Sequence, residues 1–324
     1  MNVLLIGCGG MGRMHAEMIS RSGLTLAVCA DEARPAAVAL AQKYGAKAVT
    51  DGLKAIENKN IDIVAIATPT PEHLPLIKAA ARAGKHIFCE KPFCRTVKEC
   101  EAALAAVDKA GVKLFVGHVV RYFHEFETLR EQAKSGRIGE VGFVKLYRGG
   151  LLPNGPKSWF ADYKKSGGVT MDCMIHDLDW LRYTFGEPKR IFCQALMKSK
   201  PVFMDYSQVT MRMKNGIIAT VIGSWAHPAG FRVKAELCGS EGLIAYDSAE
   251  APLTSMLRSE SATGSMIVPS SPVSESPYLR EWLDFVQWID TGKCPRVSPA
   301  DALKAVAMAE AALTSARTGQ PVAF

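Results

Sequence analysis

The sequence predicts two domains: an α/β domain with a doubly wound parallel sheet, then an α+β domain with a mainly antiparallel sheet. The chain has 324 residues, more than a typical single domain. Strands and helices alternate as far as residue 117, whereas later strands follow one another through tight turns. We therefore expect a dinucleotide-binding Rossmann domain over residues 1–118 and a second domain over residues 119–324.

The composition excludes several functional classes. The chain is 48% apolar and 22% charged, which is ordinary for a globular protein. No apolar run is long enough for a transmembrane helix, and the first residues do not resemble a signal peptide, so we expect a cytoplasmic protein without membrane contact. The net charge is +7, but lysines and arginines are spread over the chain and predict no nucleic-acid surface. The nine cysteines lack zinc-ligand spacing, which predicts free thiols and no metal site.

The first apolar run, residues 2–6, leads directly into a glycine-rich turn with the spacing G-x-G-x-x-G before a predicted helix. This context is typical of a βαβ dinucleotide site. The first glycine permits a tight turn, the second lets backbone approach a pyrophosphate, and the third allows close packing of helix and strand. Backbone N–H groups at the helix start can bind the phosphates. The predicted cofactor contacts here are Gly7, Gly9, Gly10, Met11 and Gly12.

Asp31 ends the second apolar run, residues 24–30. A carboxylate there accepts hydrogen bonds from the adenosine ribose hydroxyls and repels a 2′-phosphate. Glu32 follows where an NADP enzyme would favour arginine, so we expect NAD rather than NADP. Another interpretation makes Asp31 the N-cap of a helix over residues 32–45, and the two roles are compatible.

The alternation continues with strands predicted over 61–68, 85–90 and 112–117 and with helices over 69–84 and 96–111. Ligands bind at the carboxyl ends of such parallel strands. Thr68 and Pro69 lie at one end, and Glu90-Lys91-Pro92 lies at the next. Proline has no N–H for a sheet, so Pro92 ends its strand. Burying either neighbouring charge costs several kcal/mol unless it is paired, which predicts a functional pair at the mouth of the cofactor crevice.

The second domain is predicted to contain strands over 138–150, 190–199, 206–227 and 232–247, with hairpin turns at 214–216 and 239–242. One helix is predicted over 169–186, ending at Gly186. A Ser- and Pro-rich stretch, 248–277, is predicted as loops with at most one short strand. Amphipathic helices are predicted over 278–292 and 298–319.

Asp172 and His176 are four residues apart and would share one face of the helix predicted over 169–186. On spacing alone, His176 could be a half-buried histidine with Asp172 as its helical partner. Together with a lysine, however, the two side chains are suitable for removing a proton from an alcohol.

Several segments together resemble the glucose–fructose oxidoreductase and inositol 2-dehydrogenase family, often called Gfo/Idh/MocA. They are "GCGGMG", "ATPTPEHLPLIKAAARAGKHIFCEKP", "GHVVRY", "SGGVTMDCMIHDLDWL" and the tail "ALTSARTGQPV". The resemblance covers essentially the whole chain. It implies a Rossmann domain followed by a domain with a large open, mainly antiparallel sheet that mediates dimers or tetramers. It also implies C-terminal helices that pack back toward the first domain.

The resemblance also implies roles for individual residues. Lys91 corresponds to the active-site lysine at the nicotinamide end, and a cis peptide before Pro92 would aim it into the cleft. His176 corresponds to the acid/base, Asp172 to the aspartate that holds it and the substrate hydroxyl, and Glu90 to the glutamate near the nicotinamide ribose. The further predicted contacts are His73 for the cofactor and His118, Arg121 and Trp159 for the substrate.

The predicted activity is that of an NAD-dependent dehydrogenase acting on a CH–OH group of a polyol, a sugar or a sugar derivative. His176 would take the proton, Lys91 would stabilise the alkoxide, and Asp172 would orient the imidazole. Arg148 and Lys157 are cationic and could bind a carboxylate or a phosphate, so an acidic sugar is a further candidate substrate. The alternatives are a redox-neutral enzyme that retains NAD and a sugar or NAD sensor, although sensors tend to lose the lysine or the histidine.

Overall fold

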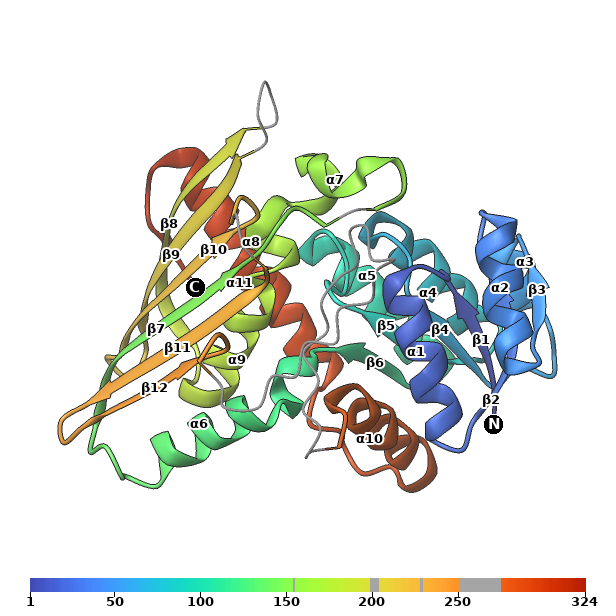
Figure 1. Ribbon diagram of the computed structural model, residues 1–324, viewed down its shortest axis with the longest axis horizontal. Helices are drawn as coiled ribbons and strands as arrows, with labels where there is room; N and C mark the ends of the chain where they lie inside the picture. Colours follow the sequence, from blue (N-terminus) through green and yellow to red (C-terminus); the bar gives the residue numbers. More distant parts are fainter. Residues whose placement is uncertain (154, 199–203, 228–229, 251–274) are drawn as a thin grey trace. The chain divides into compact units, whose positions relative to one another are not determined.

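The computed structural model describes residues 1–153, 155–198, 204–227, 230–250 and 275–324 (Figure 1). Two compact units are present. Unit 1 comprises Met1–Val119 and Glu275–Leu303, and unit 2 comprises the described residues of Val120–Ser274 together with Lys304–Phe324. Most of the stretch predicted as loops, 248–277, lies outside the described residues. Within the described part of the chain, no helix combines the length and hydrophobicity needed to cross a membrane.

Unit 1 contains a parallel six-stranded sheet with the order β3-β2-β1-β4-β5-β6. This is the strand order of a doubly wound dinucleotide-binding sheet, so the predicted fold of the first half is confirmed. Every residue of β4 and β6 is buried, as expected for parallel strands covered on both faces. The strands are β1 (Asn2–Ile6), β2 (Thr25–Ala30), β3 (Lys47–Val49), β4 (Ile63–Ile66), β5 (His86–Glu90) and β6 (Leu114–Gly117).

The helices of unit 1 begin and end at clear sequence signals. Thr96 and Glu99 form a capping box at the start of α5, and Gly111 ends that helix in the left-handed conformation. The sequence analysis did not predict β3 or α3, because each is at most five residues long. The helices are α1 (Gly10–Arg21), α2 (Arg34–Tyr44), α3 (Gly52–Ile56), α4 (His73–Arg82), α5 (Val97–Ala110) and α10 (Pro277–Thr291), with a 3-10 turn at Thr70–Glu72.

Helix α10 joins unit 1 although it lies far along the chain (Figure 1). Its Trp282 stacks on Phe88 of β5 with ring centroids 4.3 Å apart and planes inclined by 7°. Phe115 of β6 and Phe285 of α10 complete this aromatic cluster. Burial of these large rings anchors α10 to unit 1.

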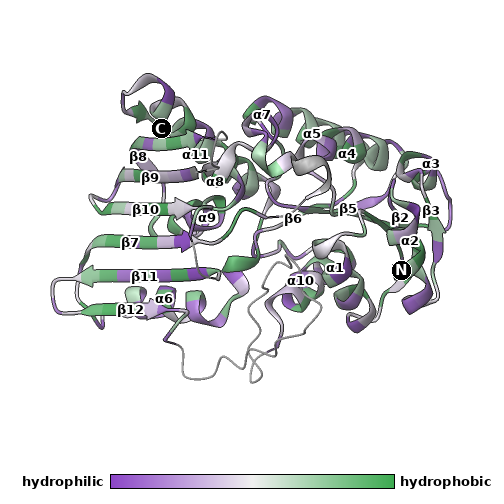
Figure 2. Ribbon diagram, turned by 45° about the horizontal axis from the view of Figure 1, so that its top comes forward, coloured by the Kyte–Doolittle hydropathy of each residue, from purple (hydrophilic) through white to green (hydrophobic). Residues whose placement is uncertain are grey.

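Unit 2 contains a seven-stranded sheet with the order β12-β11-β7-β10-β9-β8-β13 (Figure 2). Among the described strands of this sheet, only β7 and β10 pair in parallel, so the expectation of a mainly antiparallel sheet is confirmed. Both predicted hairpins, β9–β10 and β11–β12, are present. The strands are β7 (Val141–Gly149), β8 (Pro188–Lys198), β9 (Met204–Met213), β10 (Ile218–Ser224), β11 (Arg232–Gly239), β12 (Leu243–Asp247) and β13 (Val322–Ala323).

The helix predicted over 169–186 is divided, which corrects the sequence analysis. Helix α8 (Gly168–Asp172) ends before Cys173, and α9 (Ile175–Phe185) begins after Met174 and ends at Gly186 as predicted. The N–H groups of Cys173 and Met174 both donate to the carbonyl of Val169, so the hydrogen-bond register slips at this point. Asp172 and His176 therefore lie on different helices, and their spacing does not define one helical face.

Unit 2 also contains α6 (His124–Lys134), which the sequence analysis did not predict, and the short helix α7 (Tyr163–Ser166). Helix α6 is strongly polar and buries only Phe126 and Leu129, so few apolar residues mark it in the sequence. The long helix α11 (Pro299–Thr318) was predicted closely. 3-10 turns lie at Val119–Tyr122 and Pro156–Ala161.

Candidate active site

The glycine-rich turn joins β1 to α1 in a geometry that requires glycine. Gly7 has φ +94°, and a Cβ there would overlap the carbonyl of Ala67. A Cβ on Gly12 would overlap the carbonyl of Gly7, so only glycine allows α1 to pack this closely on the turn. Gly9 and Gly10 are exposed, Met11 is half-buried, and no side chain caps the first N–H groups of α1. The turn therefore presents open backbone donors of the kind that bind phosphate.

Asp31 follows β2 and is fixed by two backbone N–H groups. Its Oδ2 accepts from Cys8 in the glycine-rich turn at 2.7 Å, and its Oδ1 accepts from Ala33 at 2.8 Å. The N-cap of α2 is Ala33, so the alternative role of Asp31 as N-cap is wrong. A carboxylate offers about four acceptor positions, which leaves capacity for ribose hydroxyls.

Glu90 ends β5 and is buried together with a histidine from α1. His15 Nε2 lies 2.6 Å from Glu90 Oε1, and Trp282 Nε1 donates to His15 Nδ1 at 3.1 Å. Because the indole N–H can only donate, His15 Nδ1 must carry a lone pair. His15 is therefore neutral, with its proton on Nε2 donated to Glu90.

The electrostatics of Glu90 are consistent with an ionised carboxylate. Burial raises its pKa, but the hydrogen bond from His15, the Lys91 charge and the Lys91 N–H outweigh burial and leave the pKa below its ordinary value. Glu90 Oε2 accepts from the Lys91 N–H at 3.1 Å. The peptide that carries Lys91 is thus held by the buried glutamate before it, and the Lys91–Pro92 bond is cis as the resemblance implied.

His73, predicted as a cofactor contact, is buried between two loops at the carboxyl ends of strands. Its Nδ1 lies 2.9 Å from the carbonyl of Pro92 and 3.2 Å from that of Phe93, and its Nε2 lies 3.1 Å from the carbonyl of Thr68. Burial lowers the pKa of His73, although these carbonyls and Glu90 oppose the shift. The ring links the segment after β4 to the segment after β5.

These groups fit a dinucleotide. The Thr68 hydroxyl is buried and makes no hydrogen bond to the described residues, and Pro69 beside it is half-buried. Lys91 is half-buried, and His118 is buried directly after β6. Together with the turn and Asp31, unit 1 offers phosphate donors, a ribose acceptor and polar groups along the carboxyl edge of its sheet.

In unit 2, Asp172 is buried at the end of α8 and His176 is half-buried in the first turn of α9. The other end of α8 is held by Asp205 of β9, whose Oδ2 accepts from the Val169 N–H at 2.8 Å. Burial raises the pKa of Asp205 to about 6, although the Val169 hydrogen bond opposes the shift. Asp205 therefore helps to place the helix that carries Asp172.

Two buried arginine–aspartate pairs fix α9, and the sequence analysis missed their acidic members. Arg121 donates from Nε and Nη2 to Asp179 at 2.7 and 2.6 Å, and Arg148 donates in the same bidentate way to Asp177 at 2.8 Å. All four side chains are buried. Two aspartates among the apolar residues of α9 were the available signal, since buried carboxylates need cationic partners. A substrate role for Arg121 stays a prediction.

Trp159 is buried and packs on Phe160, with ring centroids 4.1 Å apart. Phe160 in turn makes an edge contact with Trp225. The indole thus belongs to an aromatic group near the end of β10, and its predicted sugar contact stays a prediction. The side chain of Lys157 lies outside the described part of the structure.

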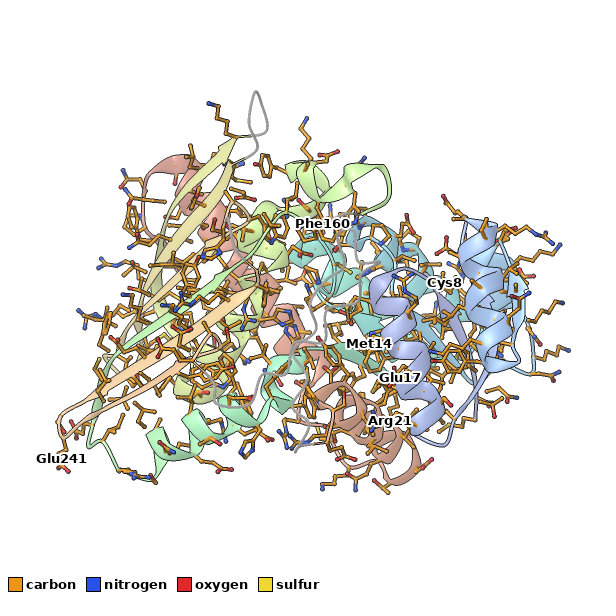
Figure 3. All side chains as sticks on the ribbon, in the orientation of Figure 1. Cys8, Met14, Glu17, Arg21, Phe160 and Glu241 are labelled. Carbon is orange, nitrogen blue, oxygen red and sulfur yellow. The ribbon has the colours of Figure 1, made fainter. Side chains whose placement is uncertain are left out.

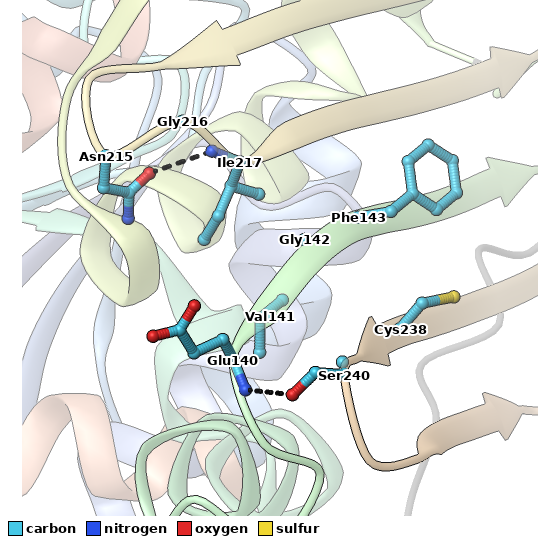
Figure 4. Close-up of a pocket in the computed structure, with 10 residues that line it drawn as sticks. Glu140, Val141, Gly142, Phe143, Asn215, Gly216, Ile217, Cys238 and Ser240 are labelled. Atoms are coloured by element: carbon cyan, nitrogen blue, oxygen red, sulfur yellow. Dashed lines mark hydrogen bonds between the residues drawn. The ribbon is translucent and has the colours of Figure 1, made fainter.

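A shallow open depression lies at one end of the seven-stranded sheet (Figure 4). It is lined by Glu140, Val141, Gly142, Phe143, Asn215, Gly216, Ile217, Cys238, Gly239 and Ser240. None of the predicted catalytic residues lines it. No group of three or more metal-ligating side chains is present in the part of the chain that the structure describes.

Comparison with known proteins supports this assignment of the fold. Residues 1–118 match the profile described as "Oxidoreductase family, NAD-binding Rossmann fold", and residues 126–245 match the GFO/IDH/MocA C-terminal domain. An inositol 2-dehydrogenase of Rhizobium meliloti is 33% identical over 96% of this chain and 95% of its own. The scyllo-inositol 2-dehydrogenase (NAD(+)) of Bacillus subtilis is 29% identical over 98% of this chain and 94% of its own.

A solved structure extends the comparison to three dimensions. The crystal structure of a putative myo-inositol dehydrogenase from Sinorhizobium meliloti superposes with a TM-score of 0.81, at 30% identity, over 99% of both chains. Both family profiles occur in order, and full-length relatives reach 33% identity. The chain therefore belongs to the Gfo/Idh/MocA family of oxidoreductases, which has an NAD-binding Rossmann fold.

Proposed function

We propose that the protein is an NAD-dependent dehydrogenase that transfers a hydride between a polyol or sugar hydroxyl carbon and nicotinamide. The observation that carries the proposal is the fixed Glu90–Lys91 element at the carboxyl end of β5, in the unit that contains the glycine-rich turn. An inositol is the first substrate to test, because relatives aligned over almost the whole chain are named inositol dehydrogenases.

The chain's own residues supply the proton chemistry. NAD, when bound, supplies a hydride acceptor at C4 of its nicotinamide ring. Lys91 donates a charge-assisted hydrogen bond to the substrate oxygen and stabilises negative charge that develops there. His176 takes the hydroxyl proton, and Asp172 orients its imidazole and holds the hydroxyl. His118, Arg121 and Trp159 are the further proposed substrate contacts.

The preference for NAD over NADP rests on Asp31. Its carboxylate is already bound to the Cys8 and Ala33 N–H groups, so it cannot easily turn away from an incoming phosphate. Glu32 beside it is exposed and adds negative charge. A 2′-phosphate would meet two carboxylates, whereas two ribose hydroxyls would find an acceptor.

We also propose residues 1–118 as the dinucleotide-binding domain and residues 119–324 as the substrate-binding and oligomerisation domain. Exposed apolar side chains on the sheet of unit 2 support a homodimer or homotetramer: Leu196, Tyr206, Ile218 and Leu243. Light scattering during size-exclusion chromatography tests this assembly. All nine cysteines are free thiols, which supports a reducing, cytoplasmic location.

The experiment that tests the function follows NADH absorbance. Purified protein is mixed with NAD or NADP and with inositols, aldoses, sugar acids and deoxy sugars. We expect NADH to accumulate with one substrate group. NAD binding measured by calorimetry with no NADH from any compound would contradict the dehydrogenase and favour the NAD-retaining enzyme or the sensor.

Variants assign the roles. We expect Lys91→Met and His176→Asn to lower kcat by about 100-fold or more while NAD affinity changes little. The control is Lys98→Met, an exposed lysine on α5, which should leave kcat unchanged. Normal turnover in either active-site variant would contradict its assigned role.

A further inference from the structure

Glu281 is a fully buried carboxyl group that neither the glycine-rich turn nor the proposed chemistry uses. It lies in the second turn of α10, next to Trp282, and its exposed fraction is 0%. Neither of its oxygens makes a hydrogen bond to the described residues. Buried carboxyl groups in proteins are normally paired or hydrogen-bonded, so this one needs an explanation.

Glu281 lies close to Glu90 at the carboxyl edge of the parallel sheet. Glu90 pairs with Gly117 across β5 and β6, and a Cβ on Gly117 would lie 3.7 Å from Oε1 of each glutamate. The two carboxyl groups therefore face the same point in a dry part of unit 1. Two ionised carboxylates so close together are unfavourable, and the usual outcome is that one of them keeps its proton.

The partners of each glutamate show which one is ionised. Glu90 accepts from His15 and from the Lys91 N–H, whereas Glu281 has no such donor among the described residues. His15 adds no positive charge, because Trp282 donates to its Nδ1. Burial, Glu90 and Asp284, one turn along α10, all raise the pKa of Glu281 well above its ordinary value. The cluster of Glu90, His15, Trp282 and Glu281 thus carries one negative charge, on Glu90.

We propose that Glu281 is a positioning residue for Lys91: it is the neutral member of a buried carboxyl pair and leaves the single charge on Glu90, which holds the Lys91 peptide. An ionised Glu281 would repel Glu90 and weaken its hydrogen bonds to His15 and to Lys91. The inference rests on the catalytic role proposed for Lys91, but the charge state of the cluster can be tested without turnover.

The first test compares the pH dependence of unfolding in Glu281→Gln and the wild type. If Glu281 stays protonated in the folded state, the protein becomes less stable as pH rises above the ordinary pKa of about 4.5, because only the unfolded chain releases the proton. Glutamine does not titrate and has no such effect. From about pH 5.5 upward, the unfolding constant of the wild type relative to the variant should rise with pH, by at most about tenfold per pH unit, for as long as Glu281 stays protonated in the folded state. The control is Glu17→Gln on α1, whose side chain is 55% exposed and whose curve should parallel the wild type (Figure 3). Parallel curves for Glu281→Gln would overturn the proposal.

The second test concerns positioning. Glu281→Ala opens space beside Glu90 and should lower kcat about 10- to 100-fold with little change in NAD affinity, whereas Glu281→Gln should restore kcat. Equal loss of kcat in both variants would show that the acid itself is required and would overturn the proposal. If the unfolding curves diverge as expected while the wild type turns over no substrate, the charge assignment stands and the dehydrogenase proposal fails.

Discussion

The two units bury their charged side chains in different ways. In unit 2 each buried aspartate of α9 meets an arginine in a bidentate pair, Arg121 with Asp179 and Arg148 with Asp177. In unit 1 the buried Glu90 meets a neutral histidine and a backbone N–H. The charges of each arginine–aspartate pair in unit 2 therefore cancel. The hydrogen-bonded partners of Glu90 leave its negative charge uncancelled.

The difference indicates two purposes. A cancelled pair fixes the backbone, and its arginine does not titrate in proteins. A carboxylate held by a neutral histidine keeps its charge, which can interact with Lys91 beside it. We infer that the pairs of unit 2 serve the stability of α9, whereas the Glu90 cluster serves the placement of Lys91.

The largest expected effect comes from breaking a cancelled pair. Asp179→Asn leaves the guanidinium of Arg121 buried without its counter-ion, and we expect a loss of about 3–5 kcal/mol in the free energy of unfolding. Denaturant titration measures it. The matched control is Glu187→Gln, which breaks the partly exposed pair with Arg182 and should cost about 1 kcal/mol or less. Equal losses would contradict the assignment of stability to the buried pairs.

Unit 1 was predictable from sequence because its signals are local. The glycine spacing, the alternating apolar runs and Pro92 each act within a few residues, and five of the six strands of the parallel sheet followed from them. The partners of Glu90 were not predictable, since His15 and Trp282 lie 75 and 192 positions away along the chain. Nothing in the local sequence states that an indole N–H will fix the tautomer of a histidine.

Unit 2 was less predictable because tertiary contacts override local patterns there. Successive strands joined by tight turns gave the right sheet class, but the slip at Cys173 and Met174 divides a segment whose sequence reads as one helix. Helix α6 has few apolar residues to mark it in the sequence. The roles of Asp177 and Asp179 depend on arginines from other elements.

The second prediction tests the neutral partner in unit 1. His15→Leu removes the side-chain donor to Glu90 and should cost about 2–3 kcal/mol in the free energy of unfolding. His15→Gln can donate to Glu90 again and should recover much of the loss. The comparison requires chemical denaturation near neutral pH. If leucine and glutamine destabilise equally, packing rather than the hydrogen bond explains the effect.

The third prediction uses Asp205, a buried aspartate that forms no ion pair with an arginine among the described residues. Its folded pKa of about 6 lies above the ordinary 3.8, so its stability contribution is present at low pH and is lost as pH rises through about 6. Asp205→Asn should remove this loss and gain about 2 kcal/mol relative to the wild type between about pH 4 and 7. Asp177→Asn is the contrast. Asp177 is paired with Arg148, so this variant should show no such gain. A constant difference between Asp205→Asn and the wild type over this range would contradict the argument.

The smallest expected effect concerns His73, which is buried with both ring nitrogens facing carbonyl oxygens. Its folded pKa is lowered by burial, so the unfolded chain binds a proton first as pH falls. The stability that His73 contributes is therefore present above about 6.5 and is lost as pH falls below that value, by about 1 kcal/mol near pH 5.5. His73→Gln keeps a donor for the carbonyls of Pro92 or Thr68 but cannot titrate, so its thermal midpoint should fall less between about pH 7 and 5.5 than that of the wild type. His227→Gln, at a half-buried histidine of unit 2, is the control and should retain the wild-type slope. An unchanged slope in His73→Gln would mean that the carbonyls around the ring stabilise the protonated imidazole enough to offset burial, and His73 would then share the electrostatics of a paired charge rather than those of the neutral His15.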